Sequence, residues 1–180
     1  LDGDGLDLIA LADSRAFFDL DNDGFAERTG WVGPDDALLA LDRNGNGRID
    51  GQTELFGGSP SDGFASLRTL DANADGTVDA ADAGFADLRL WRDLNGDGVS
   101  QAAELQSLAA ASIASLSLAS THLATPQDIA GNSVTDLSTF TRTDGTTATL
   151  ADVWFALNQR FTFDMRPVTI ADDALYLPTL

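Results

Sequence analysis

The chain has no cysteine and no lysine among its 180 residues, and only one histidine, one methionine and three glutamates. Without cysteine the protein forms no disulfide and offers no thiolate, a composition that an oxidising compartment permits. All ten basic residues are arginines, so no side chain carries a primary amine. Because His122 stands alone, we expect neither a transition-metal site nor a histidine-based nucleophilic pair.

The chain also lacks an initiator methionine, a signal-peptide pattern and any apolar run near the roughly 18 residues of a membrane span. We therefore expect a piece of a longer protein, soluble as given and without direct membrane insertion. The G-x-S-x-G, P-loop, G-x-G-x-x-G and H-E-x-x-H signatures are absent as well. Short patterns thus predict no catalytic motif.

Acidic side chains dominate what is present. Twenty-nine acids, all but three of them aspartates, give a formal net charge of −19. Aspartate and asparagine favour turns and tight loops over helix surfaces, so the charge indicates metal ligands. A halophile-like acidic surface is the alternative interpretation. The charge disfavours nucleic acid as a partner, and anionic membrane too unless calcium bridges the two.

Two acidic loops within residues 71–104 share one register. Counted from Asp71 and from Asp93 as position 1, oxygen-bearing side chains occupy positions 1, 3 and 5, glycine position 6 and an acid position 12. This is the EF-hand calcium loop, in which position 7 contributes its backbone carbonyl. The predicted calcium ligands are Asp71, Asn73, Asp75, Thr77 and Asp82 in the first loop, and Asp93, Asn95, Asp97, Val99 and Glu104 in the second.

The spacing follows from the chemistry of the ion. Calcium takes six to eight oxygens at roughly 2.3–2.6 Å, and glycine at position 6 permits the sharp turn that aims alternate side chains inward. Glu104 can close its loop with two oxygens. Asp82 is one methylene shorter, so we expect a weaker first site or one that recruits water. An acidic turn that binds nothing is the alternative for any one loop.

Three further segments carry part of the pattern. The loop from Asp19 has Gly30 at position 12, so its closing carboxylate must come from Glu27 or from the Asp35-Asp36 pair. The loop from Asp42 has its closing acid at position 13, after a one-residue insertion. The first residues of the chain form a half site. The predicted ligands are Asp19, Asp21, Asp23, Phe25 and Glu27; Asp42, Asn44, Asn46, Arg48 and Glu54; and Asp2 and Asp4.

The predicted fold class is α+β: a small calcium-organised domain with an EF-hand-like loop pair, short helices and a C-terminal β-hairpin. Apolar spacing predicts helices over residues 37–41, 64–70, 101–111 and 150–158, and one helix over 83–92 that both central loops share. Alternation predicts a strand over 113–118, a loop over 121–133 and a hairpin over 134–149 with a type I′ turn at Asp144-Gly145. We expect the module to span residues 1–158, followed by a tail or linker over 159–180.

Four blocks stand in a specific order and spacing: LDGDGLDLI, GWVGPDDALLALDRNGNGRIDGQTELFG, LDANADGTVDAADAGFADLRLWRDLNGDGVSQAAEL and TFTRTDGTTATLADVWFAL. Together they resemble the self-processing module of FrpC-like repeats-in-toxin (RTX) proteins over roughly residues 1–158. The resemblance implies a large bacterial protein, secreted or on the cell surface, and a module that calcium folds. Such a module cuts an Asp-Pro bond at its own N-terminal edge, and its new C-terminal aspartate can be joined to a lysine amine of another chain.

The expected chemistry is attack by the aspartate side chain on its own main-chain carbonyl, which forms a five-membered anhydride and releases the proline nitrogen. None of the five prolines in this chain follows an aspartate, so the scissile bond is expected upstream. Because lysine is absent, the acceptor is expected on a partner. A purely structural calcium-binding domain of an adhesin or toxin is the alternative. A calcium sensor or dockerin-like module is a third reading, which the single methionine disfavours.

Overall fold

The computed structural model describes residues 5–58 and 62–164 of the chain. The predicted half-site ligands Asp2 and Asp4 lie outside the described residues, as does most of the predicted tail, residues 165–180. The predicted α+β class is wrong. The described residues form mostly antiparallel strands with one short α-helix, and none of their helices is long and apolar enough to cross a membrane.

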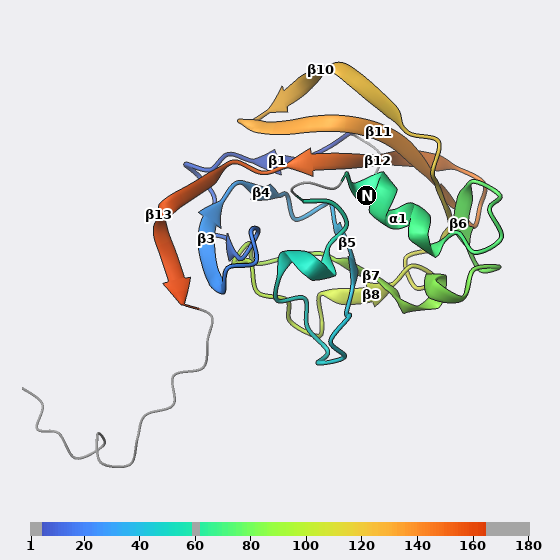
Figure 1. Cartoon of the computed structure of the whole chain (residues 1–180), viewed down its shortest axis with the longest axis horizontal. Helices are drawn as coiled ribbons and strands as arrows, with labels where there is room; N and C mark the ends of the chain where they lie inside the picture. The colour runs from blue at the N-terminus through green and yellow to red at the C-terminus, as the bar shows by residue number, and fades with distance from the viewer. Residues whose placement is uncertain (1–4, 59–61, 165–180) are drawn as a thin grey trace, which may run out of the picture.

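The largest sheet is built around β11, which crosses the upper part of the molecule in Figure 1. β11 pairs with β12 along one edge. Along its other edge it pairs with β10 and, further along the strand, with β9, and β9 also pairs with β6. These strands are β6 (Thr77–Asp79), β9 (Ile113–Ser117), β10 (Thr121–Ile129), β11 (Asn132–Arg142) and β12 (Thr147–Trp154). The predicted strand over 113–118 and the predicted hairpin are therefore confirmed.

The hairpin turn differs from the predicted type I′. That type needs positive φ at both central residues, but Asp144 has negative φ and only Gly145, at φ 84°, is left-handed. The N–H of Gly145 donates to the carbonyl of Arg142 at 2.9 Å, and the N–H of Arg142 donates to the carbonyl of Thr146 at 2.8 Å. The loop between β11 and β12 is therefore one residue longer than a two-residue type I′ turn, and Gly145 is its last residue.

Two three-stranded sheets and one strand pair complete the fold. β7 lies between β5 and β8, and β3 lies between β2 and β13. β1 pairs with β4. The bounds are β1 (Leu8–Ile9), β2 (Phe17–Phe18), β3 (Phe25–Thr29), β4 (Trp31–Val32), β5 (Leu38–Leu41), β7 (Leu88–Trp91), β8 (Leu105–Ser107) and β13 (Leu157–Asp164).

Most of the predicted helices are wrong because many of their residues form strands that pair with other strands. Residues 83–92 form the 3-10 helix η3 (Ala83–Asp87) followed by β7, so no helix is shared between loops. Residues 37–41 contain β5, residues 101–111 contain β8, and residues 150–158 continue β12 into β13. The predicted loop over 121–133 is mostly β10. The predicted boundary at residue 158 falls inside β13.

The helix predicted over 64–70 is confirmed as α1 (Gly63–Leu67) and the 3-10 helix η2 (Arg68–Leu70). The side chain of Asp62 caps it by accepting the N–H of Ala65 at 2.7 Å. The helix leads into the loop from Asp71, as its spacing predicts.

Two clusters of buried side chains stabilise the fold. One lies between the large sheet and α1 and contains Leu88 and Leu116. The other contains Trp31 and Trp91, which are both fully buried and pack edge to face with ring centroids 5.4 Å apart. Burying large aromatic side chains is among the strongest stabilising contributions available to a small domain. The acidic loops contact these two clusters.

Candidate metal centre

The loop from Asp93 shows how the acidic loops are closed. Asp93 is 1% exposed, and its two oxygens accept the backbone N–H groups of Gly96 and Gly98, each at 2.8 Å. Glu104 returns from the far end of the loop. Its two oxygens accept the N–H groups of loop positions 2 and 9 at 3.1 and 3.2 Å. The first and last acids are therefore both fixed by the backbone of the loop.

The same closure recurs in two other loops. Both oxygens of Asp82 accept the N–H groups of positions 2 and 9 at 2.8 and 3.0 Å. Glu54 accepts the N–H groups of positions 2 and 9 of its loop at 3.2 and 2.9 Å. The 3-10 helix η1 (Gln52–Glu54) takes up the extra residue, so an acid at position 13 serves where position 12 serves elsewhere. Burial, the largest influence, raises the pKa of Glu54 above its usual value.

The middle positions are also organised alike in all four loops. In each, the N–H of position 7 donates to the side-chain oxygen of position 5, at 2.8 to 2.9 Å. These pairs are Phe25 to Asp23, Arg48 to Asn46, Thr77 to Asp75 and Val99 to Asp97. At position 3, the amides of Asn73 and Asn95 donate to the acid at position 5, each at 2.9 Å, while Asn44 accepts the N–H of Asn46 at 2.9 Å. Hydrogen bonds from Thr77 and Asn73 lower the pKa of Asp75.

The loop from Asp19 is closed differently. One oxygen each of Asp19, Asp21 and Glu27 lie within 4.8 Å of one another. Glu27 comes from β3, is 2% exposed, and its Oε2 atom is buried without a hydrogen-bond partner among the described residues. Burial, and then the charges of Asp21 and Asp23, raise the pKa of Glu27. A bound cation or a proton would satisfy such an oxygen.

Of the two expected sources of the closing acid, the structure brings Glu27 to this loop. The Asp35-Asp36 pair has other contacts: Asp36 accepts the N–H of Asp7 at 2.9 Å, and Asp35 lies 3.9 Å from Arg92. Two side chains that sequence reasoning missed, Gln159 and Thr162 of β13, line the same hollow as Glu27. No short-range spacing connects them, because β13 reaches the site through its pairing with β3.

The loops contact one another in an order that the sequence does not suggest. Ile49 and Ser100, both at position 8, join the loops from Asp42 and Asp93: the hydroxyl of Ser100 accepts the N–H of Ile49 at 2.7 Å and donates to its carbonyl at 3.1 Å. Position 8 of the loop from Asp71 is Val78, which pairs with Leu116 of β9. The predicted neighbours 71 and 93 are therefore held by different sheets.

Tryptophan side chains tie the second loop to the core. The indole N–H of Trp31 donates to Oδ2 of Asp93 at 2.8 Å, and that of Trp91 donates to Oε2 of Glu104 at 3.4 Å. Both tryptophans are fully buried. The first and last acids of this loop thus depend directly on the aromatic cluster. Sequence reasoning missed both hydrogen bonds. Trp31 and Asp93 lie far apart in the sequence, and no local pattern predicts that they are in contact.

The donor set fits calcium. Each loop carries carboxylate or amide oxygens at positions 1, 3 and 5, and in the loop from Asp19 three carboxylates lie within 4.8 Å of one another; such oxygens are the ligands of hard divalent cations. A cation or a proton would satisfy the buried oxygen of Glu27, since an ionised carboxylate without a partner is costly inside a protein. The single histidine lies away from these loops, 3.2 Å from Asp136 on the large sheet.

A family model and a curated relative both match most of the chain. The SPM domain family model matches residues 1–156. The chain is also 43% identical over 174 residues to the iron-regulated protein FrpA of Neisseria meningitidis serogroup C, an alignment that covers 89% of this chain. It covers 15% of FrpA, so the chain corresponds to a small part of that relative. The chain belongs to the SPM domain family and is related to proteins of the FrpA type.

Proposed function

We propose that this chain is a calcium-binding module whose fold depends on calcium, in a large secreted or cell-surface bacterial protein of the RTX type. The observation that carries the proposal is the repeated closure of the loops. Asp82, Glu54 and Glu104 accept hydrogen bonds from the same two backbone positions of three separate loops. An acidic surface that binds no metal would not require the closing acids of three loops to accept hydrogen bonds from the same two positions.

The acids explain why folding depends on the ion. The chain carries a formal charge of −19, and folding buries acids such as Asp93 and Glu104 and brings oxygens of Asp19, Asp21 and Glu27 within 4.8 Å of one another. Like charges at short range oppose that arrangement, and burial adds a desolvation cost. Bound calcium supplies the compensating positive charge. The free ion then stabilises the folded state by about 2.7 kcal/mol per site at about 100 times its dissociation constant.

We further propose that the folded module promotes cleavage of an Asp-Pro bond at its N-terminal edge. The side-chain carboxylate of that aspartate attacks its own main-chain carbonyl carbon, the proline nitrogen takes up a proton and leaves as a secondary amine, and a five-membered anhydride forms. Water opens the anhydride to a C-terminal aspartate, or a lysine amine of a partner opens it to an amide. Membership of the SPM domain family supports this chemistry.

The test uses the native polypeptide together with its upstream stretch. We expect calcium to trigger a single cut that a gel resolves, with mass spectrometry placing the new C-terminus at an aspartate followed by proline in the parent. Adding a lysine-rich acceptor protein should yield a cross-linked product. An intact polypeptide in millimolar calcium would contradict the cleavage proposal and leave calcium binding untouched.

A structural role is the second candidate. Within the sequence, none of the prolines at 34, 60, 126, 167 and 178 follows an aspartate. If the residues upstream hold no Asp-Pro pair either, the module serves to stiffen its parent when calcium is present. Sequencing the upstream stretch distinguishes the two candidates.

A further inference from the structure

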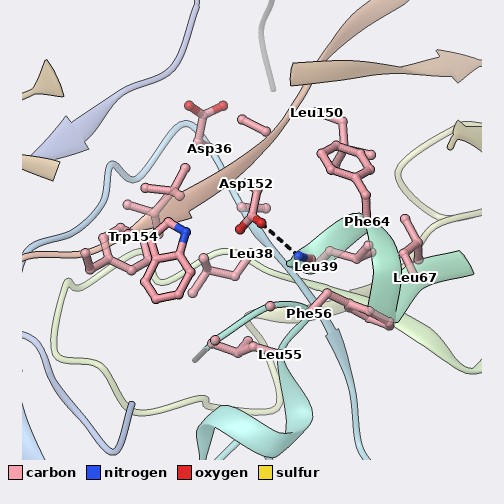
Figure 2. Close-up of a pocket in the computed structure, with 18 of the residues that line it drawn as sticks. Asp36, Leu38, Leu39, Leu55, Phe56, Phe64, Leu67, Leu150, Asp152 and Trp154 are labelled. Atoms are coloured by element: carbon pink, nitrogen blue, oxygen red, sulfur yellow. Dashed lines mark hydrogen bonds between the residues drawn. The ribbon is translucent and has the colours of Figure 1, made fainter. Parts of the chain in front are cut away.

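An apolar pocket lies apart from the acidic loops, between β5, α1 and β12. Its volume is about 310 Å³, and side chains such as Leu38, Phe56, Phe64 and Leu150 form much of its wall. Figure 2 shows these side chains around the carboxylate of Asp152, with the carboxylate of Asp36 also at the pocket. A pocket of this size accommodates a proline ring with its flanking backbone and side chains.

Asp152 is the buried acid of this pocket, which Asp21 and Asp36 also line. It stands on β12, is 7% exposed, and its Oδ2 atom accepts the N–H of Gly63 at 2.8 Å. Its other oxygen, Oδ1, lies close to Gly57, where an added Cβ would stand 3.2 Å away. Glycine at both positions lets the backbone approach the carboxylate closely. Burial, as the main influence, raises the pKa of Asp152 above its usual value.

The N-terminal part of the chain reaches the rim of this pocket. Leu6 and Leu8 belong to its lining. The chain is held there by two hydrogen bonds of Asp7: its N–H donates to Asp36 at 2.9 Å, and its carbonyl accepts the N–H of Gly33 at 2.7 Å. The first described residues therefore contact this pocket.

We propose that this pocket receives the Asp-Pro segment upstream of the module and that Asp152 delivers a proton to the departing proline nitrogen. The inference rests on the proposed self-cleavage and adds a residue to it. The peptide C–N bond breaks as the side-chain oxygen of the scissile aspartate bonds to the carbonyl carbon. The nitrogen takes the proton of the Asp152 carboxylic acid and leaves as a secondary amine. Water that opens the anhydride returns a proton to Asp152.

The pocket suits this task on physical grounds. A tertiary amide nitrogen leaves readily only when it is protonated, and a carboxylic acid whose pKa is raised by burial is a suitable proton donor. The apolar walls favour binding of the proline ring. General acids of this kind contribute about 100-fold to 10,000-fold to the rate.

The test compares two variants of the native polypeptide with its upstream stretch. Asp152→Asn keeps the shape and the hydrogen bond to Gly63 but removes the acid, so we expect cleavage in calcium to slow by about 100-fold or more. Asp128→Asn, the same change elsewhere on the large sheet, should leave the rate within about twofold of wild type. Circular dichroism in calcium checks that both variants fold. Asp152→Glu, which retains an acid, should recover part of the rate.

The pH profile of the wild-type polypeptide is an independent measurement. The rate should fall as pH rises through the pKa of Asp152, which faces the acids Asp62 and Asp136 and shares its pocket with Asp21 and Asp36. A wild-type chain that is cut at an unchanged rate across that range, or an Asp152→Asn chain cut as fast as wild type, overturns the inference alone. A wild-type chain that is never cut overturns the proposed cleavage and this inference with it.

Discussion

At the scale of single residues, the proposal of calcium binding depends most on the acid that closes each loop. Glu54 stands one position later than the pattern requires, yet its two oxygens reach the same backbone positions as those of Glu104. The register of the loops could be predicted from the sequence because it is a local property of tight turns. The tryptophan contacts could not, because they join Trp31 to Asp93 across a fold whose pairing no local spacing specifies.

Replacing Glu54 by glutamine tests the displaced closing acid. Glu54→Gln removes one negative charge from the loop of Asp42, so we expect calcium affinity there to fall by about tenfold or more, equivalent to about 1.4 kcal/mol. Isothermal titration measures the change. The exposed control Asp87→Asn removes the same charge outside the loops and should leave affinity unchanged. Equal affinity in Glu54→Gln and the control would mean that Glu54 is no ligand.

Replacing Trp31 by phenylalanine tests the link between the core and the loop from Asp93. Trp31→Phe keeps an aromatic ring but removes the N–H that Asp93 accepts at 2.8 Å. Losing a hydrogen bond to a buried charge costs about 1.5–3 kcal/mol, so unfolding in calcium should require less denaturant. Trp154→Phe, at a position that is 42% exposed, is the control and should cost much less. Equal midpoints for the two variants would refute the link.

At the scale of elements, the sequence misled where apolar spacing suits both helix and strand. Leu150, Val153 and Trp154 have helical spacing, yet all three belong to β12, which pairs with β11 along its length. Phe85, Leu88 and Trp91 repeat every third residue, but Leu88 to Trp91 form the middle strand of a sheet. Pairing partners that are distant in sequence decide such segments, and tertiary context overrides local preference. The hairpin was predictable because its partners are adjacent.

The strand β13 provides a test at this scale. It pairs with β3 beside Glu27, and Phe163 packs edge to face on Phe17 with ring centroids 4.6 Å apart. A chain that ends at residue 156 should therefore melt about 2–4 °C or more below one that ends at residue 164, where 2–4 °C corresponds to about 1 kcal/mol. Differential scanning calorimetry in calcium makes the comparison. Matching melting temperatures would show that β13 adds nothing to the module.

At the scale of the whole molecule, the buried acids predict how the metal-free chain responds to pH. The pKa values of Glu27 and Glu54 are raised from 4.5 in the fold. Groups with raised values favour the folded state fully below their unfolded pKa, and that contribution is lost as pH rises through the folded values. Asp75 and Asp144, whose pKa values are lowered from 3.8, titrate below this window. The metal-free chain should thus be more ordered near pH 5 than at pH 7.5.

Circular dichroism in calcium-free buffer across this range checks the expectation. The double variant Glu27→Gln, Glu54→Gln should be more ordered than wild type at pH 7.5 without calcium and should depend less on pH. A metal-free wild type that loses structure as the pH falls toward 5 would contradict the assignment of these acids as the source of instability.

The most direct test of the central claim is a calcium titration of the metal-free chain at neutral pH, followed by calorimetry and far-ultraviolet circular dichroism together. We predict that the chain lacks its β-sheet spectrum in chelator. It should gain that spectrum as calcium binds to the loops from Asp19, Asp42, Asp71 and Asp93. A full β-sheet spectrum in chelator, or a folded chain that takes up no calcium, would contradict the account.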